Sequence, residues 1–135
     1  MNYWLIKSDP ETYSWDDLVK DKKTTWDGIR NYQARNNIRL MKKGDSLLVY
    51  HSNLGEVAGL AEVTKEAFQD PTTDDKNWVA VEIKAVKKLK TPVTLAEIKS
   101  NNKLQDIPLI KNTRLSVMPV KKADYDEIVK MSDSK

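Results

Sequence analysis

The 135-residue sequence contains no cysteine and a single histidine, His51. The absence of cysteine excludes a disulfide framework, thiolate zinc sites, iron–sulfur clusters and a cysteine nucleophile. With one imidazole, a metal centre would depend on carboxylates, and Asp70, Asp74 and Asp75 lack the spacing of a calcium-binding loop. We therefore expect neither a metal ion nor a cofactor.

Glycine and long hydrophobic runs are also scarce. The four glycines do not fall in the spacing of a dinucleotide-binding loop or a Walker loop. Gly28 suits a left-handed turn, and Gly59, inside an expected strand, suggests a bulge or a close backbone approach. The longest apolar stretches, such as 47–50, are about five residues long, whereas a membrane helix needs about 20. The sequence shows no export signal, and together with the lack of cysteine this predicts a cytoplasmic protein without a membrane partner.

Positive and negative charges nearly balance, with 23 Lys and Arg against 20 Asp and Glu. The resulting net charge of +3 permits a nucleic-acid partner but does not require one. Four lysines cluster in one short stretch, at Lys84, Lys87, Lys88 and Lys90. This cluster fits either a solvated strand edge that resists aggregation or a rim that faces phosphates.

The pattern of apolar residues predicts one α+β domain over residues 1–135. The expected strands are 3–7, 46–52, 57–64, 78–89 and 114–119. The expected helices begin after Ser14, Asn31, Thr94 and Lys121, with capping boxes at Ser14 and Thr94. In the first helix, Trp15, Leu18 and Val19 are expected to form the apolar face, and the polar run 21–25 to end it. Residues 70–76 are expected to form a polar loop. Because the neighbouring strands are joined by short turns, we expect a small mixed barrel or curved sheet surrounded by short helices. The tail 132–135 is expected to fray.

The segment 25–36 combines two aromatic side chains, Trp26 and Tyr32, with arginines and amides. A flat heterocycle stacks on an aromatic ring with about 1–3 kcal/mol per base, and amides read its edge through paired hydrogen bonds. A purely structural role is the alternative, with Trp26 in the core, Asn31 as a helix cap and Arg35 in solvent. The residues alone leave both interpretations open.

A second polar cluster, His51, Ser52 and Asn53, stands at the end of the second expected strand. Neighbouring residues of a strand point to opposite faces, so His51 and Ser52 cannot form a nucleophile–base pair. The sequence also lacks a serine-hydrolase elbow. Lys7 and Ser8 end the first expected strand, where the sheet would bring them near both polar segments.

Three blocks of the sequence, 3–10, 26–36 and 50–53, resemble the signature of the EVE domain family. They read YWLIKSDP, WDGIRNYQARN and YHSN, and their order and spacing match the family across essentially the whole chain. The resemblance implies a PUA-like fold similar to that of YTH domains. It also implies a non-catalytic module that recognises a modified base, such as a methylated one, in an aromatic and polar pocket.

The same resemblance implies a set of functional residues. The residues that would line the base pocket are Lys7, Ser8, Trp26, Asn31, Tyr32, His51, Ser52 and Asn53. The candidates for phosphate contacts are Arg30, Arg35 and Arg39. The implied partner is DNA or RNA with a modified base, and we favour a monomer.

Two other functions stay open. PUA-like relatives such as ASCH domains include amidohydrolases of modified nucleosides, and Lys7 with a carboxylic acid would then form the acid–base pair. A module that binds a small ligand or a protein, without a nucleic-acid role, is also compatible with the modest net charge. A steep loss of affinity with rising salt would separate a nucleic-acid binder from this last class.

Overall fold

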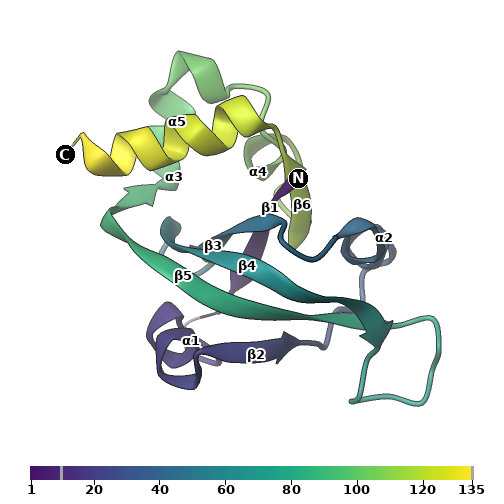
Figure 1. Ribbon diagram of the computed structural model, residues 1–135. Helices are drawn as coiled ribbons and strands as arrows, with labels where there is room; N and C mark the ends of the chain where they lie inside the picture. Colours follow the sequence, from purple (N-terminus) through teal and green to yellow (C-terminus); the bar gives the residue numbers. More distant parts are fainter. Residues whose placement is uncertain (10, 135) are drawn as a thin grey trace.

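The computed structural model describes residues 1–9 and 11–134, and within them six strands form one mixed sheet of order β2-β5-β4-β3-β1-β6 (Figure 1). The strands are β1 (Tyr3–Ser8), β2 (Lys23–Trp26), β3 (Ser46–His51), β4 (Glu56–Gln69), β5 (Val79–Thr94) and β6 (Val117–Val120). Only the pair β1 and β3 is parallel among the described strands. The predicted α+β class and curved mixed sheet are confirmed, and the sheet is open, with β2 and β6 as its edges.

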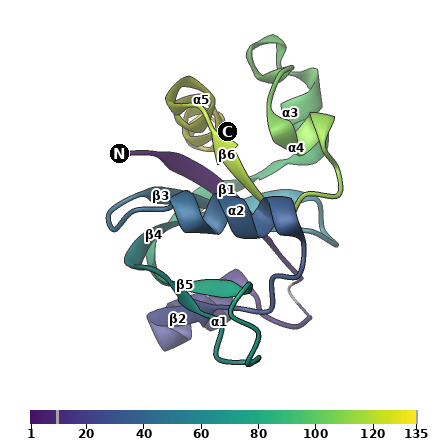
Figure 2. The ribbon, with the colours of Figure 1, turned by 90° about the vertical axis from the view of Figure 1, so that its right-hand side faces the viewer.

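Short helices surround the sheet on several sides. They are α1 (Trp15–Asp21), α2 (Tyr32–Leu40), α3 (Leu95–Ser100), the 3₁₀ turn η1 (Asn102–Leu104), α4 (Pro108–Lys111) and α5 (Lys122–Asp133). Both views show α3, α4 and α5 together on one side, with α1 beside β2 on the other (Figures 1 and 2). In the described part of the chain, every helix is too short or too polar to cross a bilayer.

Side-chain caps fix where the helices begin. The Ser14 hydroxyl accepts a hydrogen bond from the Asp17 amide at 3.1 Å, and the Asp17 carboxylate accepts one from the Ser14 amide at 2.9 Å. Thr94 and Glu97 form the same reciprocal pair before α3. These bonds satisfy amides that have no partner inside the helix, and both capping boxes confirm the sequence-based predictions.

The sheet is larger than the sequence predicts. β2 lies in a polar stretch that was expected only to end the preceding helix, and β4 and β5 extend well beyond 57–64 and 78–89. β2 is an edge strand with half-buried polar side chains, so it lacks the apolar alternation that marks a strand. The β4–β5 pairing shifts register at several points. These β-bulges bend the two-stranded ribbon of β4 and β5, which continues beyond the apolar segment.

Two further expectations are corrected at the chain's helices. Val19, expected on the buried face of α1, is half exposed, because Trp15 and Leu18 already fill that face. The expected frayed tail is wrong for its first residues, since α5 continues through Asp133. Ser132 is fully buried, and its hydroxyl donates to the Thr91 carbonyl at 2.7 Å. Residue 135 lies outside the described residues.

The contact between Trp15 and Gly59 anchors α1 on the sheet. A Cβ atom built on Gly59 would lie only 2.5 Å from the Trp15 indole, so a larger residue would collide with the ring. This confirms the predicted close approach at Gly59. By fixing the start of α1, the contact also fixes the segment before it, which contributes to the cleft described next.

Candidate functional site

A cleft of about 460 Å³ opens where the end of β1, the segment before α1 and the end of β2 meet. Its lining residues are Lys7, Ser8, Asp9, Thr12, Tyr13, Thr24, Thr25, Trp26, Asp27 and Ile29. The volume falls in the range of small-molecule sites. Aromatic surface and groups that donate or accept hydrogen bonds therefore face the same space.

The aromatic part of the cleft consists of Trp26 and Tyr13. Trp26 ends β2, where it pairs with Val81 of β5, and its side chain is half-buried. Its ring meets Tyr13 edge to face, with 6.1 Å between centroids and 76° between planes. The Tyr13 hydroxyl donates to Asp21 at 2.7 Å, and burial together with Asp21 raises the Tyr13 pKa. Trp26 is thus held in place while part of its surface faces the cleft.

Lys7 and Ser8 reach the cleft from the end of β1. The Lys7 ammonium donates to the Thr113 carbonyl at 2.9 Å, and burial lowers the pKa of this lysine. The Ser8 hydroxyl donates to the Tyr13 carbonyl. An ammonium carries three hydrogens, so Lys7 keeps donor capacity for a ligand, whereas Ser8 spends its hydrogen on positioning the segment before α1.

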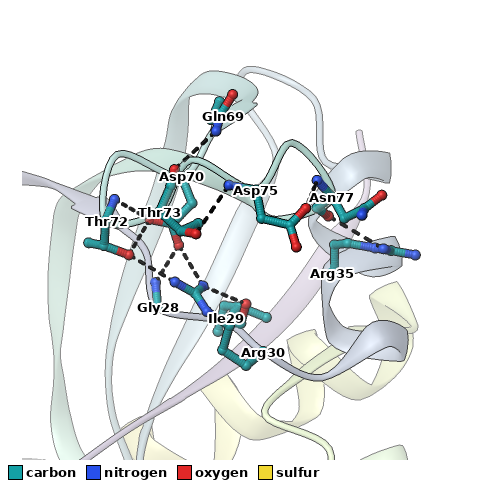
Figure 3. A network of polar contacts seen from close by, with 10 residues as sticks. All are labelled: Gly28, Ile29, Arg30, Arg35, Gln69, Asp70, Thr72, Thr73, Asp75 and Asn77. Carbon is teal, nitrogen blue, oxygen red and sulfur yellow. Dashed lines mark hydrogen bonds and ion pairs between the residues drawn. The ribbon is translucent and has the colours of Figure 1, made fainter.

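A buried carboxylate shapes the turn after β2 (Figure 3). Asp70 is fully buried, and its Oδ2 accepts hydrogen bonds from the Gly28 amide at 2.8 Å and from the Arg30 guanidinium at 2.9 Å. Burial alone would raise the pKa of Asp70, but hydrogen bonds from Thr72 and Arg30 outweigh it and hold the pKa well below its usual range. Gly28 adopts the predicted left-handed backbone, with φ of 76°.

Asp27 brings a second carboxyl group to this turn. Burial and the nearby Asp70 carboxylate raise the pKa of Asp27. Asp27 lines the cleft, so its carboxyl can accept a hydrogen bond from a ligand or, when protonated, donate one. In the described ranges, no group of three or more potential ligand side chains is placed to hold a metal ion.

Comparison with known proteins decides the family. A family model described as the EVE domain matches residues 2–131. The chain belongs to the EVE domain family. Human thymocyte nuclear protein 1 is 34% identical over an alignment of 167 positions, gaps included. The alignment covers 98% of this chain and 74% of the human protein.

Solved structures share the fold of this EVE domain. A protein from Agrobacterium tumefaciens superposes with a TM-score of 0.95 at 43% identity, over 98% of this chain and 93% of its own. Human thymocyte nuclear protein 1, crystallised with DNA that contains 5-methylcytosine, superposes with a TM-score of 0.91 at 32% identity. The match covers 100% of this chain and 99% of the human chain. A YTH domain from Zygosaccharomyces rouxii, bound to N6-methyladenosine RNA, superposes with a TM-score of 0.59 at 17% identity. The match covers 97% of this chain and 86% of the YTH chain, and it shows a likeness of fold alone.

In this EVE domain, the residues that line the cleft do not include His51, Ser52 or Asn53. His51 is buried, and its Nε2 accepts a hydrogen bond from the Trp15 amide at 3.0 Å. The exposed Ser52 donates its amide to the Ser8 carbonyl at 2.9 Å. These contacts brace the cleft's walls from outside, while Asn53 stands in the exposed turn before β4.

Asn31 and Tyr32 also lie outside the cleft lining. The Asn31 side chain accepts a hydrogen bond from the Ala34 amide at 2.9 Å, which is the predicted helix cap. Tyr32 begins α2, and 66% of its surface is exposed. Of the eight residues expected to line the pocket, the structure brings Lys7, Ser8 and Trp26 together around one space.

The three candidate arginines lie in and near α2. Arg30 forms an ion pair with Asp70, whereas Arg35 and Arg39 donate to the Asn77 carbonyl, each at 3.4 Å. Arg35 and Arg39 share one face of α2, as their spacing predicts. All three thus face the loop between β4 and β5.

Sequence reasoning missed several residues of the lining, most clearly Tyr13 and Asp27. Tyr13 stands directly before the Ser14 cap, and an aromatic residue at that place was the available signal. Asp27 gave none, because its altered pKa depends on burial and on Asp70, which is remote in the sequence.

Proposed function

We propose that this EVE domain binds a modified base of DNA or RNA in the cleft and does not catalyse a reaction on it. The base would leave its stack, which costs on the order of a few kcal/mol. Stacking of the base on Trp26 offsets this cost by about 1–3 kcal/mol. Hydrogen bonds to Lys7 and Asp27 would then read the edge of the base.

The observation that carries this proposal is the partly open face of Trp26. An indole that served the core alone would be sealed, whereas this one lines a cleft beside a lysine and a carboxyl group. The proposal gains support from the human relative crystallised with 5-methylcytosine DNA, which matches this chain over its whole length.

Selection for the modification would depend on the shape of the cleft. A buried methyl group contributes only about 0.8 kcal/mol, which is a few-fold in affinity. A larger preference requires a space in the cleft that an unmodified base leaves empty, or a polar group of the protein that an unmodified base leaves without a hydrogen-bond partner. Trp26 and Ile29 are the apolar lining residues available for such a wall.

The main experiment is a fluorescence anisotropy titration with matched oligonucleotides that contain cytosine or 5-methylcytosine. Trp26→Ala is expected to weaken binding of the methylated probe about 5- to 150-fold, which corresponds to the loss of one stacked base. Trp26→Phe keeps an aromatic ring and serves as the matched control. Equal affinity for both probes, unchanged in Trp26→Ala, would refute base recognition by this cleft.

One observation favours a second function, the hydrolysis of a modified nucleoside. Lys7 has a lowered pKa and Asp27 a raised one, and both line the same cleft. Opposite shifts of this kind are typical of acid–base pairs. Product formation from 5-methylcytidine or N-acylated cytidine that disappears in Lys7→Ala would establish the enzyme and displace the non-catalytic proposal.

The proposal includes a cytoplasmic monomer, as the sequence predicts. Sedimentation of the purified protein tests the monomer directly. Microscopy of a fluorescent fusion in the source cells tests the location.

A further inference from the structure

An aromatic pair, formed by the exposed Tyr32 and the half-buried Trp78, stands beside the cleft and has no part in the core. The rings of Tyr32 and Trp78 lie 5.2 Å apart between centroids, with 31° between their planes. Neither belongs to the hydrophobic core cluster or to the partly buried side chains packed against it. Tyr32 is 66% exposed, which is unusual for a large aromatic side chain. Packing therefore does not account for this pair.

Two arginines complete this surface, which we call the stacking patch: Arg30, Tyr32, Arg35 and Trp78. The guanidinium carbon of Arg35 lies 4.9 Å from the Tyr32 centroid and 5.7 Å from that of Trp78. The guanidinium carbon of Arg30 lies 5.6 Å from the Trp78 centroid. Aromatic faces interleaved with cations are the usual means of holding single-stranded nucleic acid without reading its sequence.

The patch is held in one arrangement before any ligand arrives. Its two halves come from α2 and from the loop between β4 and β5, which lie on the same side of the molecule (Figures 1 and 2). The Asn77 carbonyl accepts from Arg35, and Asp70 holds Arg30 (Figure 3). A surface that is already ordered loses little conformational entropy on binding.

The two arginines of the patch differ in whether a carboxylate balances their charge. Asp70 balances Arg30, while Arg35 forms no ion pair with any carboxylate in the described residues, and neither does Arg39 one turn further along α2. Charge-assisted pairing with a phosphate is therefore open to Arg35 and Arg39. These two cations lie one turn apart on the same face of α2, beside the loop that carries Asn77.

The patch is continuous with the cleft. Ile29 lines the cleft, and Arg30, the next residue, borders Trp78. The cleft and the patch therefore adjoin each other at residues 29 and 30. We propose that the stacking patch is a second site, which stacks an unpaired base flanking the one held in the cleft and contacts its phosphate through Arg35. This inference rests on the proposed function of the cleft.

Three probes separate the patch from the cleft: a short single-stranded DNA with one 5-methylcytosine, the same strand with abasic neighbours, and 5-methyldeoxycytidine monophosphate. We expect Tyr32→Ala to weaken binding of the first probe about 5- to 100-fold. Binding of the other two should stay unchanged. Tyr32→Phe keeps the ring and should bind as the parent protein does.

The outcomes distinguish failure of the patch from failure of the cleft. If Trp26→Ala weakens all three probes but Tyr32→Ala weakens none, the patch proposal is wrong and the cleft proposal stands. If Tyr32→Ala weakens the monophosphate as much as the strand, Tyr32 belongs to the cleft and a separate site is refuted. Absence of binding by the parent protein would overturn both proposals.

Salt dependence tests the phosphate contact independently. Arg35→Gln should reduce the slope of log affinity against log salt by about 0.7 for the single strand, the value for one lost phosphate contact. Lys130→Gln, on the exposed surface of α5, is the control for lost charge. An unchanged slope in Arg35→Gln would remove the phosphate contact from the proposal.

Discussion

Two buried carboxylates, Asp45 and Asp70, organise two different regions of this EVE domain. Asp45 accepts hydrogen bonds from the Asn2 and Lys42 amides and from the Trp4 indole, all neutral donors. Asp70 also accepts amide hydrogen bonds, but it adds the Arg30 guanidinium. The first arrangement fastens the start of the chain to the core. The second also orients Arg30, the residue of the stacking patch that adjoins the cleft.

The difference shows that a buried, hydrogen-bonded carboxylate can either fasten a segment to the core or position a charged side chain at the surface. A groove near Asp45, lined by residues such as Trp4, Leu40 and Val120, is larger than the cleft, at about 860 Å³. One lining residue there, Lys122, has a raised pKa because it forms a hydrogen bond and an ion pair with Asp126, which does not line the groove. In the cleft, by contrast, shifted groups converge. The convergence of these groups, rather than the volume, therefore favours the cleft as the binding site that we propose.

The largest expected effect comes from Asp70→Ala. Removing this carboxylate leaves the Arg30 guanidinium and two backbone amides without their acceptor. Because Arg30 is partly exposed and can be rehydrated, the free energy of unfolding should fall by about 3 kcal/mol, the upper end for hydrogen bonds to a charged group. Urea denaturation measures the loss. We also expect weaker binding of a methylated single strand by the protein that remains folded. Unchanged binding would show that the turn 27–30 keeps its shape without Asp70.

Asp45→Ala should have a smaller effect and no effect on binding. It leaves neutral donors unsatisfied, at about 1–3 kcal/mol in the free energy of unfolding. The affinity of the folded variant for the same single strand should equal that of the parent protein. A loss of affinity in this variant would break the contrast between the two regions.

The smallest effect concerns the response to acid. Both carboxylates have folded-state pKa values below the unfolded value of about 3.9. Their contributions are therefore present at pH 5 and above and are lost as pH falls through the folded-state pKa values. Each contributes a slope of at most about 1.4 kcal/mol per pH unit to that loss.

Urea unfolding of Asp70→Asn and Asp45→Asn between pH 2 and 5 compares these two contributions. The pKa of Asp70 is the more strongly lowered, so Asp70→Asn should flatten the acid limb further than Asp45→Asn. Equal flattening would mean that the guanidinium adds nothing to the anchoring of Asp70.

The features that the sequence predicted correctly depend on neighbours along the chain. Capping at Ser14, Asn31 and Thr94 follows from side chains only three residues from the amides they bind. The left-handed turn at Gly28 and the close contact at Gly59 follow from what glycine alone tolerates. Such features can be recognised without knowing the rest of the fold.

The features that the sequence did not reveal depend on distant partners. Asp70 was placed in a polar loop, because nothing near it indicates that Arg30, 40 residues away, would bury it. Trp78 was expected only to begin a strand, since its stacking partner Tyr32 is equally remote. The EVE resemblance grouped His51 with the pocket residues, and a resemblance of blocks cannot tell a lining residue from one that braces it.

The open sheet ends on two strands of four residues each, and one of them, β6, carries Pro119. A proline offers no amide hydrogen, so a foreign strand that approached β6 would find its ladder interrupted. Short, interrupted borders of this kind discourage runaway cross-β stacking between copies. Both edges of the open sheet are thus poor templates for the addition of a further strand.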